Sequence, residues 1–159
     1  FRNHLEESSS QARNGDHRKA ESALQKATQL ADREFKDTQH HNFISIVLLI
    51  AEGDLHLSQG NYLAAEESYE DILAQLRRHP QEAVDPQLPD WSSTVINNLG
   101  LAYKGQGKYG QAKAQLEQAL AHANYALAAQ NDPAIKSSFV KLINTIQDNL
   151  SDVCRQLGQ

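Results

Sequence analysis

Seven histidines, one cysteine and several adjacent acidic pairs are the residues of this chain that could do chemistry. The histidines form no His-x3-His pair and no HExxH motif, and the single Cys154 excludes a paired CxxC, so the pattern holds no metal-ligand set. Adjacent acids such as Glu66 and Glu67 splay apart on a helix and do not pair as acid and base. There is also no Gly-rich phosphate-binding loop. These patterns predict a protein that is not an enzyme and has no cofactor or metal.

Charge and hydropathy narrow the classes of partner further. A net charge of −5 and a pI of about 5.8 argue against nucleic acid, whose binding requires a basic stripe. The longest apolar run, FISIVLLIA at 43–51, is far shorter than the ~20 residues that span a bilayer, so we expect no membrane span. The lone Cys154 cannot form an internal disulfide, which favours a cytoplasmic location. Because the chain contains no Met at all, we also expect it to be a segment of a longer protein.

Four glycines mark a repeated pattern that must position any functional residues. They recur at intervals of 45, 47 and 51 residues, at Gly15, Gly60, Gly107 and Gly158. The clearest copy is INNLGLAYKGQGKYGQAKAQLEQAL at 96–120, and AEGDLHLSQGNYLAAEESYEDIL at 51–73 follows the same pattern. The first copy is fainter, and DNLSDVCRQLG at 148–158 aligns with the start of the third. Such self-similarity is typical of repeat proteins built from helix pairs.

The third copy resembles the tetratricopeptide repeat family. The residues that carry the resemblance are Leu99, Gly100, Tyr103, Gly107, Tyr109, Ala112, Leu116, Ala119 and Leu120. The resemblance implies an all-α, right-handed solenoid of antiparallel helix pairs that forms a single domain over 1–159. Small residues such as Gly100 and Ala112 would let paired helices approach closely, and Gly107 would end a helix in a left-handed conformation. The spacing exceeds the family's usual repeat of about 34 residues, so the chain resembles the extended-repeat variety.

Residues that break or cap helices predict about seven helices. Three prolines in the stretch 80–90 end one helix, Asp90 caps the next, and Asp132 with Pro133 starts the last. The helices are expected at 2–14, 17–38, 42–59, 61–79, 91–106, 109–130 and 134–157. They form repeats at about 1–38, 42–79 and 91–130, followed by the lone helix 134–157.

The resemblance implies that the first helix of each pair lines a concave groove, where a peptide would bind. Transferring that stripe by alignment gives the expected peptide-binding residues Asn98, Asn149, Asn97, Leu101, Lys104, Ile50, Asp54, Leu57 and Arg13, with Ser9 and Ala51 on the same stripe. Asn98 and Asn149 share one repeat position, and an amide both donates to and accepts from a peptide backbone. The alternative is that these amides bond neighbouring helices. Likewise the apolar Ile50, Leu57 and Leu101 either anchor a partner or belong to the core.

The sequence therefore predicts a protein-binding module that holds a peptide or partner helix. Two alternatives stay open: a scaffold that self-associates into a homo-oligomer, and a peptide-sensing regulatory domain of a larger signalling protein. Relatives that grip the acidic tails of chaperones use a clamp of Lys, Asn and Arg. The corresponding positions hold no Lys or Arg, which excludes a chaperone C-terminal tail as partner; they are Leu5, Ser9, Ala51, Thr94 and Asn98.

Overall fold

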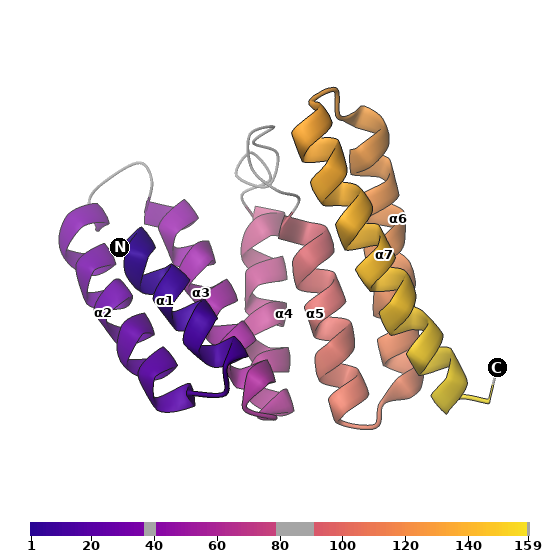
Figure 1. Ribbon diagram of the computed structural model, residues 1–159, viewed down its shortest axis with the longest axis horizontal. Coiled ribbons are helices and arrows are strands. Elements are labelled where there is room, and N and C mark those ends of the chain that lie inside the picture. Colours follow the sequence, from indigo (N-terminus) through magenta and orange to yellow (C-terminus); the bar gives the residue numbers. More distant parts are fainter. Residues whose placement is uncertain (37–40, 79–90, 159) are drawn as a thin grey trace. The chain divides into compact units, whose positions relative to one another are not determined.

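The computed structural model describes residues 1–36, 41–78 and 91–158, and these form seven α-helices and no strand (Figure 1). The helices are α1 (Arg2–Arg13), α2 (His17–Phe35), α3 (His41–Ser58), α4 (Tyr62–Arg78), α5 (Trp91–Gly105), α6 (Tyr109–Ala129) and α7 (Pro133–Gln156). The other expected helix ends agree to within one residue, but the expected ends at 38 and 79 lie outside the described residues, and α2 ends at Phe35. No helix in these ranges has an apolar stretch long enough to cross a bilayer.

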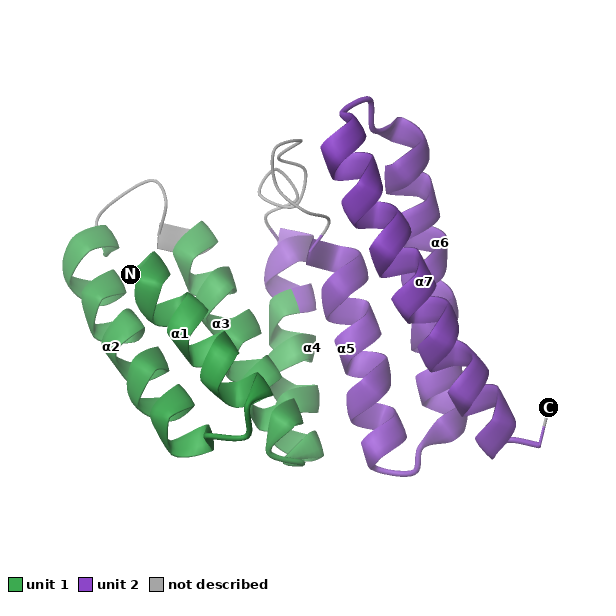
Figure 2. Cartoon of the chain, viewed as in Figure 1, with its two compact units in different colours: residues 1–72 green, residues 73–159 purple. Residues whose placement is uncertain are grey.

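The chain divides into two compact units, residues 1–72 and 73–159, with the boundary inside α4 (Figure 2). In the first unit, α1 packs against α2, and α3 packs against both of them. In the second unit, α5 packs against α6, while α7 packs against α6 and also reaches α5. Consecutive helices thus pack on one another within each unit, which confirms the all-α, solenoid-type architecture.

The repeated glycines end helices as expected. Gly15, Gly60, Gly107 and Gly158 all have positive φ, between 72° and 77°. At Gly107 the backbone N–H donates to Lys104 O at 2.9 Å, and the next N–H, of Lys108, donates to Tyr103 O at 2.9 Å. This pair of bonds is the Schellman motif, which needs a left-handed residue that only glycine adopts without strain. The repeat signal in the sequence is therefore a signal for helix termination.

Two other glycines permit close contact between paired helices. A Cβ on Gly100 would lie 2.9 Å from Leu116 Cγ and 3.4 Å from the backbone oxygen of Ala112. A Cβ on Gly53 would lie 2.7 Å from Cε1 of the fully buried Tyr69. The predicted close approach at Gly100 is thus confirmed, and Gly53 plays the same part in the first unit.

Alanines, together with Leu116, also fill the seams along the second helices of the pairs. Their buried positions recur every three or four residues, which is one face of a helix, at Ala20, Ala23, Ala27 and Ala31 on α2 and Ala112, Leu116, Ala119 and Ala123 on α6. The last helix begins where expected, because Asp132 Oδ1 accepts the N–H of Ala134 at 2.7 Å and of Ile135 at 3.2 Å, with Pro133 at its first position. Asp90, the other expected cap, lies outside the described residues.

Candidate functional site

Three asparagine side chains form a row across α5 and α7 in the second unit. The Nδ2 of Asn149 donates to Oδ1 of Asn97 at 3.0 Å, and Nδ2 of Asn97 donates to Oδ1 of Asn98 at 2.9 Å. Asn97 is buried, at 4% exposed, whereas Asn98 and Asn149 are half-buried. The structure thus brings the three predicted amides together, and Asn149 bonds a neighbouring helix through its nitrogen.

A charged cluster lies farther along the same two helices. Lys104 on α5 pairs with Asp152 on α7, and Arg155 Nη1 lies 3.4 Å from Asp152 Oδ1. The hydrogen bond from Lys104, with a smaller contribution from Arg155, lowers the pKa of the Asp152 carboxyl from its ordinary value of 3.8. Lys104 is therefore held by its ion pair, while Arg155 keeps a side chain that is 75% exposed.

Replacing Asp152 by asparagine is expected to lower the melting temperature slightly near neutral pH, because exposed ion pairs contribute little. Because the pKa is lowered in the folded state, the ionised carboxylate stabilises the fold above pH 3.8, and this contribution disappears as the pH falls through the folded pKa. Thermal unfolding of both proteins across a pH series should show the difference closing only below pH 3.8. Asp148→Asn, an exposed change on the same helix, is the control for the loss of one negative charge. A difference that persists into strong acid would contradict the assignment.

The first unit carries a hollow of about 210 Å³ between α1 and α3. Predicted groove residues from both helices line it, namely Ser9, Arg13, Ala51 and Asp54. The carboxylate of Asp54 is oriented by Tyr69, whose hydroxyl donates to Oδ1 at 2.6 Å. Ser8 on the floor donates to Ala20 O at 2.9 Å, which ties α1 to α2. The hollow thus has opposite charges on its two walls.

The apolar residues of the predicted site do not gather in one place. Ile50 and Leu57 are half-buried on α3 and lie outside the lining of this hollow, and Leu101 is half-buried on α5. Half-burial agrees with either interpretation of these side chains, as anchors or as core. The predicted site residues therefore form two groups, one in each unit.

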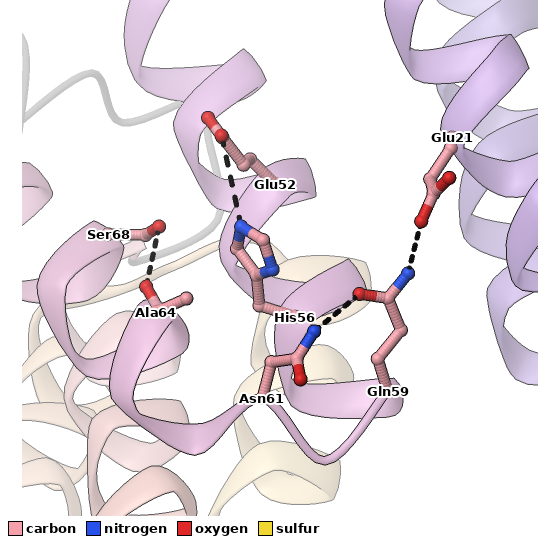
Figure 3. A network of polar contacts seen from close by, with 7 residues as sticks. All are labelled: Glu21, Glu52, His56, Gln59, Asn61, Ala64 and Ser68. Carbon is pink, nitrogen blue, oxygen red and sulfur yellow. Dashed lines mark hydrogen bonds and ion pairs between the residues drawn. The ribbon is translucent and has the colours of Figure 1, made fainter.

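A larger hollow, of about 560 Å³, lies between α2 and α3 and was missed by the sequence analysis. Leu24, Leu48 and Leu49 line it together with Glu52 and His56. At one end Gln59 Nε2 donates to Glu21 Oε1 at 2.6 Å, and Gln59 Oε1 accepts from Asn61 at 3.0 Å (Figure 3). The sequence signal for this hollow is the run FISIVLLIA at 43–51, which is apolar all round. Contact with one neighbouring helix would leave some of these apolar side chains uncovered.

Two histidines of the first unit contact neighbouring side chains on α2 and α3. Within the described residues, no three His, Cys, Asp or Glu side chains gather closely enough to hold a metal ion. His56 Nε2 lies 3.9 Å from Glu52 Oε1 (Figure 3). The other ring nitrogen of His56, Nδ1, is buried and has no hydrogen-bond partner among the described residues. His17 Nδ1 lies 3.4 Å from the hydroxyl of Ser58, across α2 and α3.

Comparison with known families supports the helix-pair reading of the third repeat. Residues 93–124 match the family model of the tetratricopeptide repeat, and they comprise most of α5, the turn at Gly107 and most of α6. Comparisons with curated proteins and with solved structures gave no match. The matched segment contains Asn97, Asn98, Leu101 and Lys104. Together with the glycine turns, this match supports a tetratricopeptide repeat in residues 93–124, and the general role of such repeats is protein–protein interaction.

Proposed function

We propose that this protein–protein interaction module holds a peptide or a partner helix on the faces made by first helices of its repeats, α1 with α3 and α5 with α7. The observation that carries the proposal is the row of Asn98, Asn97 and Asn149. Amides fixed by one another in this way present backbone-like groups to a ligand without needing to be ordered on binding. Such a row reads a peptide backbone rather than a particular side chain.

The hydrogen bonds leave a defined acceptor in this row. The Nδ2 of Asn149 donates to Asn97, whereas the Oδ1 of Asn149 accepts no hydrogen bond from any described residue. This oxygen is therefore available to a peptide N–H. Farther along α7, the exposed guanidinium of Arg155 supplies a positive group for an acidic side chain of the partner. Backbone recognition and charge steering would thus act along one face of the second unit.

The first unit supports the same mode of binding with different groups. Its hollow between α1 and α3 is sized for a single partner side chain, with Arg13 and Asp54 on opposite walls. The half-buried Ile50 and Leu57 on α3 supply apolar surface to anchor the partner. We expect these groups to select side chains, while the amide row holds the backbone.

Replacing Asn98 and Asn149 together by alanine is expected to weaken partner binding about tenfold, because two ligand hydrogen bonds are lost. The wild-type chain would be used as bait in a cytosolic extract, since a cytoplasmic location is part of the proposal. Captured proteins would be identified by mass spectrometry, and the Kd of the purified partner then measured for each variant.

The matched control is Asn124→Ala, which removes an exposed amide on α6 that donates only to Leu120 O of its own helix. It should bind as the wild type does. Equal affinity for all three proteins would remove the amide row from the binding surface. Capture of the chain's own copies alone, with a mass by light scattering that rises with concentration, would favour the self-associating scaffold. An output domain on the full-length gene product would favour the regulatory domain.

A further inference from the structure

We infer that the hollow between α2 and α3 is a second docking surface, and that it takes an amphipathic helix of a partner protein with leucine-like side chains flanked by Lys or Arg. The surface is made by α2 and α3 of the first unit and shares no residue with the amide row, which lies on α5 and α7 of the second unit. Its defining residues are Leu24, Leu48, Leu49, Glu21, Asp32 and Glu52.

The floor of this surface determines the apolar part of the occupant. Leu48 and Leu49 on α3 are half-buried, and Leu24 on α2 is half-buried opposite them. A hollow of about 560 Å³ between two neighbouring helices has the size of a binding pocket and accommodates side chains from a third helix. Amphipathic helices place their apolar stripe into grooves of this kind.

The rim determines the charge of the occupant. Glu21, Asp32 and Glu52 line the surface, and Lys and Arg are absent from the described residues that line it. In the described part of the chain none of these three carboxylates pairs with a Lys or Arg; Glu21 bonds the neutral amide of Gln59, and Glu52 faces only His56 (Figure 3). Uncompensated negative charge attracts basic side chains and repels both nucleic acid and anionic membranes. The occupant is therefore a basic protein segment.

The spacing of the rim carboxylates determines the length of that segment. Glu21 and Asp32 are eleven positions apart on α2, which corresponds to roughly 16 Å at 1.5 Å per residue. A helical partner covers this distance in about three turns, so its basic residues should flank two or three apolar layers.

The test uses a fluorescein-labelled peptide of about eighteen residues, with leucines at helical spacing and lysines flanking them, titrated with the full chain. Replacing Asp32 and Glu52 together by lysine is expected to weaken its Kd about tenfold. Glu67→Lys with Asp71→Lys is the matched control, because it makes the same change in net charge at exposed positions of α4. That control should leave the Kd unchanged, as should Asn98→Ala with Asn149→Ala.

Two altered peptides test the chemistry without altering the protein. Exchanging the lysines for glutamates should abolish binding, and exchanging the leucines for glutamines should weaken it about tenfold. Absence of binding by the original peptide would overturn the inference. So would equal weakening by both pairs of charge reversals, unchanged binding of the glutamine peptide, or loss of binding in the Asn98→Ala/Asn149→Ala variant. The last result would place the peptide on the amide row and leave the proposed function standing.

Discussion

Replacing Gly100 by alanine is expected to destabilise the fold by about 1–3 kcal/mol, the usual cost of overpacking a core. The added Cβ would lie 2.9 Å from Leu116 Cγ and 3.1 Å from its Cδ2, closer than packed carbons approach. Leu116 is fully buried, so it has little room to move aside. The backbone oxygen of Ala112 at 3.4 Å limits the same shift of the helix. Chemical denaturation of the two proteins would measure the difference.

The chain offers a matched control for this change in the same helix pair. Gly110 lies on α6, and a Cβ there would meet no atom within 4 Å. Because alanine favours helix over glycine, Gly110→Ala should be neutral or stabilise by up to about 1 kcal/mol. Trimming Leu116 to valine in the Gly100→Ala background should recover part of the lost stability, so the two changes together should cost less than their sum. Equal effects of alanine at positions 100 and 110 would contradict the close-packing argument.

The helices and their turns were predictable because the signals for them are local. A left-handed residue at a helix end is specified by glycine itself, and Gly107 and its three counterparts recur at spacings visible in the sequence. Asp132 with Pro133 likewise starts a helix through bonds to residues two and three positions away. Local rules of this kind act the same way in each repeat, so a faint first copy could be recognised from a clear third copy.

The bonding within the candidate site was not predictable to the same degree. Alignment places Asn98 and Asn149 at one repeat position, but Asn149 bonds Asn97, a contact between α5 and α7 that the alignment does not specify. The hollow between α2 and α3 was missed for a related reason. The apolar run on α3 shows that several faces are apolar, but which of them α1 and α2 leave uncovered depends on how three helices pack.

Replacing Asn97 by alanine is expected to cost about 1–3 kcal/mol of stability, because it removes both the acceptor for Asn149 and the donor for Asn98. A double-mutant cycle with Asn149→Ala should give a coupling energy of about 1 kcal/mol between the two amides. Free energies of unfolding of the wild type, the two single variants and the double variant supply the four corners. A coupling energy near zero would mean that the bond between Asn97 and Asn149 contributes nothing to the fold.

The same cycle separates the two roles that Asn149 can play. Alanine at position 149 removes the Nδ2 used within the fold and also the Oδ1 proposed to accept from a peptide. In the Asn97→Ala background the first role is already lost, so any further loss of partner affinity on adding Asn149→Ala reports the second role alone. If Asn149 acts on the ligand, affinity should fall again in that background by about five- to tenfold. If the amide of Asn149 only joins α5 to α7, adding Asn149→Ala should leave the affinity unchanged. Other groups on the face formed by α5 and α7 would then bind the peptide backbone.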